Sequence, residues 1–331
     1  MTIEVRVTAL LKVAHFVIIT PGRCGLYSTT QELVTNLRLQ GVDSRMVDPL
    51  PDTNPVNFKG KEDRGALVAD LKWAEGADIL VSHSGIGALE SKKPFILVVH
   101  GRPYHSFLTE SVGGGAGIYS YHYRSNKKPN LKAVVTFWPQ HVPYLEVMMP
   151  DKPIHYVQST VDLDFWSPGP KRYDFEGKAG GVNIVCTDAL RNDVDCYNPL
   201  NAYALWARKN KHLNPKLHMF NKPKDMRGWN PLIKRIQDDG NMGMVVGWAR
   251  GLEHVYRAAD ATITAHNIDV RTVRESMACG CPVVRINRIT DNYALTMALR
   301  EDREYVRRQA KFLFDPAESA KQFKEILESH K

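Results

Sequence analysis

The chain has 331 residues, more than one ordinary domain holds, so its length predicts two domains. Hydrophobic residues make up 43% and charged residues 24%, a balance that excludes a disordered chain. Residues 1–11 do not read as a signal peptide, and no long uncharged apolar run follows, so we expect a cytoplasmic protein without a transmembrane segment. The net charge of +8 favours phosphate-bearing partners: a nucleotide, a nucleic acid or an anionic membrane surface.

In the first half, short apolar runs alternate with helix-length segments, beginning with a predicted strand at 15–20. A glycine-containing loop and then a helix follow. We predict that Ser28 caps this helix, that Gln31 completes a capping box, and that Gly41 ends it. The further strands predicted in this half are 78–81, 95–99, 133–137 and 154–157.

A proline-rich, charged stretch at 167–172 separates this half from a second alternation of the same kind. At its end, Asp315 and Pro316 are predicted to start a helix whose apolar face includes Phe323. The pattern predicts α/β domains at 1–166 and 167–314, each a parallel sheet with both faces covered, and a C-terminal helix at 315–331 that packs back across them. The strands predicted in the second half are 182–186, 217–220, 244–246, 261–264 and 282–286.

Five cysteines form an odd set without the paired spacing of a metal site. Cys279 and Cys281 stand two residues apart, where the pattern predicts a helix end and a turn. We therefore expect reduced structural thiols and no bound metal.

The most informative segment, 255–286, is predicted to form a helix, a strand, a polar loop, a helix, a turn and a strand. Backbone N–H groups at the start of the second helix have no partner within it, and the helix dipole adds positive charge there, so this start suits a diphosphate. Glu275, one turn further, is placed to accept hydrogen bonds from a ribose diol. The loop residue His266 and the helix-start residues Arg271, Thr272 and Val273 complete the predicted donor-binding group.

This segment resembles the donor-binding signature of the large retaining, glycogen synthase-like glycosyltransferase family. That family carries two Glu with seven residues between them, followed by Ala-Met-Ala-Cys-Gly-x-Pro-Val-Val; residues 275–284 read Glu-Ser-Met-Ala-Cys-Gly-Cys-Pro-Val-Val. Residues 256–260 match the run before the donor loop. The resemblance implies an α/β GT-B fold, with two Rossmann-like doubly wound domains facing a cleft. It also implies metal-independent, retaining hexosyl transfer from a nucleotide sugar such as UDP-glucose.

The chain departs from the family at Asn267, which stands eight residues before Glu275 where the family has its first Glu. That acid contacts the sugar in the family, so Asn267, His266 or Asp269 would take over its contacts. In the N-terminal half, the family has a cleft-facing histidine that contacts the transferred sugar. The corresponding residue is His100, directly after the strand predicted at 95–99, with a histidine satisfied within its loop as the alternative. His100, Asn267 and Asp269 are thus the predicted catalytic residues.

Other positions match the family less specifically. Gly22 and Gly25 resemble its glycine-rich loop at the cleft, although a plain strand-to-helix turn also favours glycine. Arg191, just beyond the strand predicted at 182–186, would be half of its basic pair for the diphosphate. Of two further polar positions, His83 is a weaker sugar-contacting candidate than His100, and Arg102 could meet a phosphate or the acceptor.

Two Asp-x-Asp pairs, 162–164 and 193–195, could instead bind a divalent ion, as in the other glycosyltransferase fold. Residues 161–168 also resemble the family's Val-Asp-x-x-x-Phe/Trp-x-Pro stretch at the start of the second domain. That match favours a structural role for the first pair.

For the acceptor, basic and aromatic residues in the first half suggest a hydroxymethylated pyrimidine in DNA, as for a phage-type DNA-modifying enzyme. A glycan, lipid-linked or small-molecule acceptor is the alternative, and contact with a membrane surface stays open. A sugar-nucleotide epimerase and a non-catalytic nucleotide- or DNA-binding protein are the other functions compatible with the pattern. The candidate acceptor-binding residues are Arg102, Tyr121, Tyr123 and Arg124.

Overall fold

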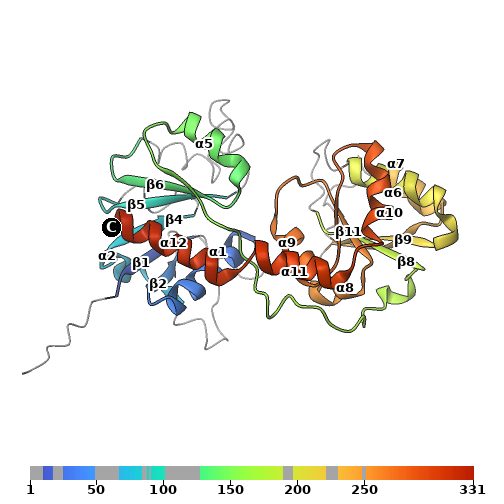
Figure 1. Cartoon of the computed structure of the whole chain (residues 1–331), viewed down its shortest axis with the longest axis horizontal. Coiled ribbons are helices and arrows are strands. Elements are labelled where there is room, and N and C mark those ends of the chain that lie inside the picture. Colours follow the sequence, from blue (N-terminus) through green and yellow to red (C-terminus); the bar gives the residue numbers. More distant parts are fainter. Residues whose placement is uncertain are drawn as a thin grey trace, which may run out of the picture. The chain divides into compact units, whose positions relative to one another are not determined.

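The chain forms two compact units: unit 1 comprises residues 1–160 and 315–331, and unit 2 comprises 161–314. Each holds one parallel β-sheet with helices packed against it (Figure 1). Among the helices that the structure describes, none combines the length and apolar character needed to cross a membrane. The computed structural model describes residues 10–17, 25–48, 67–83, 88, 91–100, 127–188, 197–220, 230–247 and 251–331.

The sheet of unit 1 runs in the order β3-β2-β1-β4-β5-β6-β7. The chain starts in the middle with β1, adds β2 and β3 on one side, and then places β4 to β7 on the other. This is the order of a doubly wound sheet, and the reversal falls between β1 and β4. The strands are β1 (Lys12–Phe16), β2 (Asp43–Val47), β3 (Val68–Ala69), β4 (Ile79–Ser82), β5 (Phe95–Val99), β6 (Leu131–Thr136) and β7 (Ile154–Tyr156).

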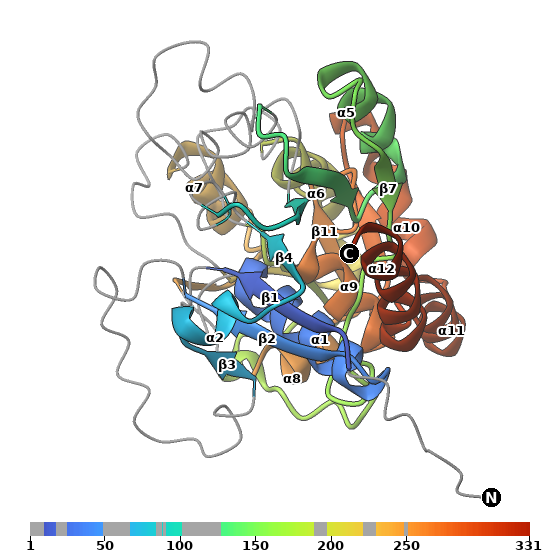
Figure 2. The ribbon, with the colours of Figure 1, turned by 90° about the vertical axis from the view of Figure 1, so that its left-hand side faces the viewer.

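Three strands of this sheet differ most from the sequence-based prediction; one of them, the two-residue β3, was not predicted. β1 begins at Lys12, three residues before the predicted start, because Lys12 already pairs with Asp43 of β2. The Lys12 ammonium group lies over the Trp73 ring, 4.4 Å from its centroid. β2 was not predicted, since Asp43 and Arg45 interrupt its apolar pattern. The Arg45 guanidinium group also covers Trp73, at 4.8 Å, which brings helix α2 (Leu71–Glu75) beside β2 (Figure 2).

Helix α1 (Gly25–Leu39) begins three residues before Ser28, so the prediction that Ser28 caps it is wrong. Tyr27 is 2% exposed and packs with Val34, and its burial draws the turn before Ser28 into the helix. Gly41 follows the helix with φ +79°, a conformation that favours glycine, as predicted for the stop.

The C-terminal helix α12 (Pro316–His330) belongs to unit 1 and packs along α1 (Figure 1). Its predicted start is confirmed: the Asp315 side chain accepts a hydrogen bond of 2.8 Å from the Ala317 N–H, and Pro316 is the first helical residue. Phe323 is fully buried on its apolar face. The remaining helices described in unit 1 are η2 (Pro139–His141) and α5 (Val142–Met148).

Unit 2 repeats the doubly wound order as β10-β9-β8-β11-β12, with the reversal between β8 and β11. The prediction of two Rossmann-like parallel-sheet domains is therefore confirmed. Its strands are β8 (Val182–Cys186), β9 (Pro215–Phe220), β10 (Met242–Val246), β11 (Ala261–Thr264) and β12 (Val283–Arg285). Its helices are η3 (Phe175–Gly177), α6 (Tyr197–Lys209), η5 (Lys211–Leu213), α7 (Asn230–Asp238), α8 (Leu252–Ala258), α9 (Arg271–Ala278), η6 (Ile289–Asn292), α10 (Tyr293–Ala298) and α11 (Arg303–Leu313).

Helix α9 is held against the middle of unit 2 by α8 and α11. Behind it, Cys279 and Cys281 are free thiols, each 0% exposed. Burial raises the pKa of the Cys279 thiol to about 12, so both cysteines serve as small core residues. Gly280 between them has φ +74°, which fits the sharp turn from α9 towards β12.

Candidate functional site

Doubly wound sheets bind ligands beyond the carboxyl ends of their strands, at the point where the strand order reverses. In unit 2 this point lies beyond β8 and β11, and in unit 1 beyond β1 and β4. The polar side chains that follow these strands are therefore the first candidates for a binding site.

In unit 2, a buried carboxylate, Asp188, follows β8 and is only 4% exposed. The Thr264 hydroxyl, at the end of β11, lies 2.9 Å from both of its oxygens, and the Ala265 N–H donates to Oδ2 at 2.8 Å. His266 Nε2 lies 3.8 Å from Oδ1. Burial raises the pKa of the Asp188 carboxyl, against the opposing effects of His266 and these hydrogen bonds. Asp188 thus fixes the start of the loop that follows β11.

The loop after β11 leads into α9, which begins at Arg271 as predicted. No side chain caps this start: Val270 has extended backbone, and its carbonyl accepts hydrogen bonds from the N–H groups of Val273 (3.0 Å) and Arg274 (3.2 Å). The Val273 N–H, one of the groups predicted to bind the diphosphate, is therefore already engaged within the first turn. Thr272 lies in the same turn.

One turn into α9, Glu275 is 4% exposed and forms an ion pair with Arg271, whose Nε lies 2.5 Å from Oε1. Burial, and secondarily the negative charge of Glu275, raise the pKa of Tyr256 well above its usual value. The Tyr256 hydroxyl donates to Thr187 Oγ1 at 3.1 Å, so α8, β8 and α9 meet around Glu275. The carboxylate is held in place and neutralised by an arginine of its own helix.

A second ion pair, between Arg285 on β12 and Asp269, ties the loop to the sheet. Arg285 also donates to the His266 carbonyl at 3.4 Å. Asn267 lies in the same loop and is exposed. Asp188 and Arg285 were not among the predicted site residues; a charged residue at the carboxyl end of a short apolar strand is the signal that could have found each.

In unit 1 the corresponding point is occupied by histidines. His15 on β1, His83 directly after β4 and His100 directly after β5 form a chain, with ring nitrogens 3.0 and 2.9 Å apart. Burial lowers the pKa of His15 to about 3 and that of His83 well below its usual value. The structure thus links His100, a predicted catalytic residue, to His83, the weaker of the two candidates.

Two further predicted positions have structural roles. Gly25 is the first residue of α1 and not part of the preceding loop. Asp162 serves a local turn: its Oδ1 accepts from the N–H groups of Asp164 and Phe165, which agrees with the structural role predicted for it. In the described stretches, His, Cys, Asp and Glu residues form no cluster of three that could hold a metal ion. Gly22, Arg191, Arg102, Tyr121, Tyr123 and Arg124 lie outside the described residues.

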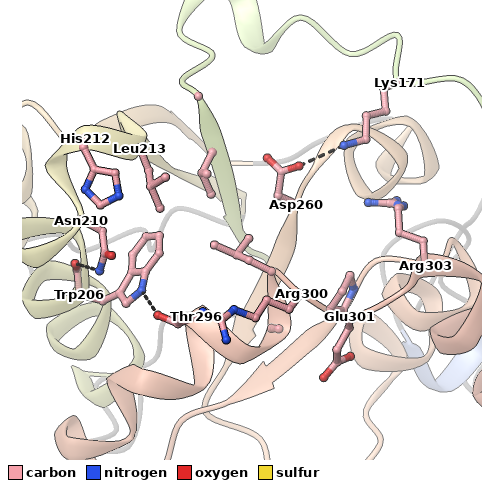
Figure 3. Close-up of a pocket in the computed structure, with 15 residues that line it drawn as sticks. Lys171, Trp206, Asn210, His212, Leu213, Asp260, Thr296, Arg300, Glu301 and Arg303 are labelled. Atoms are coloured by element: carbon pink, nitrogen blue, oxygen red, sulfur yellow. Dashed lines mark hydrogen bonds and ion pairs between the residues drawn. The ribbon is translucent and has the colours of Figure 1, made fainter.

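A pocket of about 580 Å³ opens at the other edge of the unit 2 sheet, beside the amino ends of β8, β11 and β12 (Figure 3). Lys171 points towards Asp260, with Nζ 3.0 Å from Oδ1, and the Trp206 indole donates to Thr296 Oγ1 at 2.9 Å. Arg303 donates to carbonyls of the neighbouring backbone, among them Ala259 O at 2.7 Å. Because the pocket lies at the amino ends of the strands, and doubly wound sheets bind ligands beyond the carboxyl ends, it is a weaker candidate than the region beyond β8 and β11.

No protein-family model and no curated protein matches the sequence. Among solved structures, the chain is similar to sucrose-phosphate synthase from Thermosynechococcus elongatus (TM-score 0.69, 13% identity, 96% of this chain and 98% of that one). It is also similar to WaaG, a glycosyltransferase involved in lipopolysaccharide biosynthesis (0.61, 14%, 95% and 99%). A putative UDP-N-acetylglucosamine 2-epimerase from Listeria monocytogenes aligns comparably (0.60, 12%, 97% and 97%). Identities this low establish the architecture alone: the chain has the two-domain Rossmann-like fold of GT-B glycosyltransferases.

Proposed function

We propose that the chain is a glycosyltransferase that moves a sugar from a nucleoside-diphosphate donor to an acceptor hydroxyl. The observation that carries this proposal is the loop and helix start beyond β11, where a buried Glu275 lies one turn behind a helix start that has no side-chain cap. This combination suits both ends of a nucleoside diphosphate: a carboxylate for the ribose diol and an electropositive helix start for the phosphates.

For the donor, a UDP-sugar such as UDP-glucose is our first proposal. Arg271 supplies a cation at the helix start, and its pairing with Glu275 keeps both groups in place. The same fold accommodates a nucleotide in the catalytic domain of starch synthase IV from Arabidopsis thaliana, a structure described as bound to ADP and acarbose (TM-score 0.62, 13% identity).

The reaction breaks the bond between the anomeric carbon and the diphosphate oxygen while the acceptor oxygen bonds to that carbon and passes its proton to the departing diphosphate. Negative charge develops on the departing diphosphate, and a preorganised helix start with Arg271 stabilises it without a metal ion. His100, Asn267 and Asp269 contact the sugar in this proposal. We infer retention of the anomeric configuration from the family resemblance of residues 275–284.

For the acceptor, we propose first a hydroxymethylated pyrimidine in DNA, on the strength of the net charge of +8. A glycan or lipid-linked acceptor is the second candidate, favoured by the structural similarity to WaaG, which is involved in lipopolysaccharide biosynthesis. Donor binding is common to both, so the test of the enzyme class does not depend on this choice.

The experiment is mass spectrometry after incubation with a panel of nucleotide sugars, each with modified DNA, with glycans and with no acceptor. A mass increase of one hexose on an acceptor, with release of free nucleoside diphosphate, supports the proposal. Conversion of the nucleotide sugar into an isomer without acceptor would instead identify an epimerase. Absence of any turnover across the panel would leave a binding protein.

Within this experiment, Glu275→Ala should weaken donor binding by about 1–3 kcal/mol, because ribose hydroxyls lose a charged partner. Isothermal titration calorimetry measures this change. Glu301→Ala, which removes an exposed carboxylate of the same unit, serves as the control and should leave donor affinity unchanged. Equal affinities of the two variants would contradict the role given to Glu275.

A further inference from the structure

Three histidines from three neighbouring strands form one row across the middle of the unit 1 sheet. His83 follows β4, which lies between β1, the strand of His15, and β5, which His100 follows. His15 Nδ1 lies 3.0 Å from His83 Nε2, and His83 Nδ1 lies 2.9 Å from His100 Nε2. Successive ring centroids are 5.3 and 5.1 Å apart.

The row is closed at its inner end. His15 and His83 are 0% and 1% exposed, and the His15 ring lies against Phe323 of α12, with centroids 6.1 Å apart. His15 Nε2 is buried and has no hydrogen-bond partner among the residues that the structure describes. At the outer end, His100 is only partly buried and lies beside Phe137, with ring centroids 5.3 Å apart.

Both inner rings are neutral at pH 7, because burial lowers the pKa of His15 and, with the neighbouring histidines, that of His83. A neutral imidazole donates from one nitrogen and accepts at the other, so the two consecutive N···N hydrogen bonds must run in the same direction. If they ran inward, His15 Nε2 would carry a buried N–H without an acceptor. If they run outward, His15 Nε2 carries only a lone pair. A buried N–H without an acceptor is rarer and costs more free energy than a buried lone pair without a donor, so the outward direction is favoured.

We propose that His83, backed by His15, is a positioning residue that holds His100 as the tautomer with its hydrogen on Nδ1. His100 Nε2 then accepts from His83, and Nδ1–H is a fixed donor for a hydroxyl oxygen of the transferred sugar. This inference rests on the proposed function, in which His100 contacts that sugar. In this arrangement His100 acts by donating a hydrogen bond and not as a base, because Nε2 accepts from His83 and Nδ1 carries the hydrogen.

The tautomer is measured directly by NMR of the full chain with ¹⁵N-labelled histidine, since long-range correlations to ring protons distinguish Nδ1–H, Nε2–H and imidazolium forms. His100→Gln assigns the signals of His100. We expect the Nδ1–H form in the unaltered protein. His100 found as the Nε2–H form would overturn the proposal, and this measurement decides even if a variant fails to fold.

Two variants and a control sharpen the test. His83→Phe removes the donor to His100, so the Nε2–H form should appear; His83→Asn keeps an acceptor and an N–H donor, so it should preserve the Nδ1–H form. His155→Phe breaks another histidine pair of unit 1, His155–His330 (3.3 Å), and should not change the His100 signals. An unchanged His100 tautomer in His83→Phe would also overturn the proposal.

Turnover gives a second readout. With a nucleotide sugar that the unaltered protein turns over, His83→Phe should lower kcat about tenfold, because one hydrogen bond to the transition state is lost. His83→Asn should restore most of this activity. The double variant His83→Phe/His100→Gln should be no slower than His100→Gln alone. If the unaltered protein turns over no donor at all, the proposed function fails, while the NMR measurement still decides the tautomer.

Discussion

The two units share one strand order but carry opposite kinds of polar chemistry where that order reverses. In unit 1 the reversal point holds a row of buried histidines, two of which burial keeps uncharged. In unit 2 it holds charged groups: buried Asp188 beside His266, Asp269 with Arg285, and Glu275 with Arg271. The topology thus sets where a ligand can bind, and the residues after the strands set what kind of group binds there.

Under the proposed function, this difference suits the two kinds of group in a nucleotide sugar. A charged diphosphate needs a field of opposite sign, which ion pairs and a helix start supply, whereas sugar hydroxyls need neutral donors and acceptors. Removing charge from unit 2 and forcing charge into unit 1 test this difference between the units.

Forcing charge into unit 1 should have the largest effect. The folded-state pKa of His15 is about 3 and that of His83 is also lowered, so the unfolded chain binds protons that the folded chain does not. The free energy of unfolding should therefore fall as the pH drops below about 6.5, by up to about 1.4 kcal/mol per pH unit for each histidine. For His15 this fall should continue to about pH 3.

Urea denaturation at a series of pH values measures this slope. His15→Phe should make the slope of the free energy of unfolding against pH shallower by the contribution of one histidine. His212→Phe, which replaces an exposed histidine of unit 2, should leave this slope unchanged. The same slope in His15→Phe and the unaltered protein would show that His15 is not buried uncharged.

Removing the buried charge of unit 2 should come next. Asp188→Ala leaves the Thr264 hydroxyl and the Ala265 N–H without their acceptor, and the loss should be about 3 kcal/mol in the free energy of unfolding. Asp188→Asn keeps one acceptor oxygen and should lose less. Denaturation curves followed by tryptophan fluorescence measure both, with Asp238→Ala, an exposed aspartate of the same unit, as control. Equal stability of Asp188→Ala and the control would refute the anchoring role.

The smallest effect is expected at the loop itself. Asp269 and Arg285 are 36% and 33% exposed at their side chains, so solvent screens their attraction. Asp269→Asn should therefore cost less than about 1 kcal/mol in denaturation experiments. A loss as large as that of Asp188→Ala would mean that the outer pair, and not the buried carboxylate, holds the loop.

Local patterns predicted much of the fold correctly. β5, β8 and β11 have the predicted bounds because each is a short apolar run in the interior of a parallel sheet. The prediction failed where contacts between distant parts of the chain, and not a local apolar run, formed the strand. β2 is a strand although Asp43 and Arg45 interrupt its apolar pattern, because it pairs in parallel with β1 and β3.

The candidate site divides in the same way. Glu275 and the start of α9 followed from neighbouring residues, because a helix start and the turn behind it are local features. Asp188, Arg285 and His83 acquired their roles only from partners: Thr264 lies 76 residues from Asp188 in sequence, and His15 lies 68 from His83.

Local sequence patterns were enough to predict the alternation of strands and helices, the donor-like loop and helix, and the position of His100 after a buried strand. Which polar groups meet depends on tertiary packing. Periodicity and capping act over a few residues, whereas parallel pairing brings together the ends of strands that are far apart in the chain. The histidine row therefore depends on β1, β4 and β5 lying side by side. The loop that Asp188 anchors depends in the same way on β8 and β11.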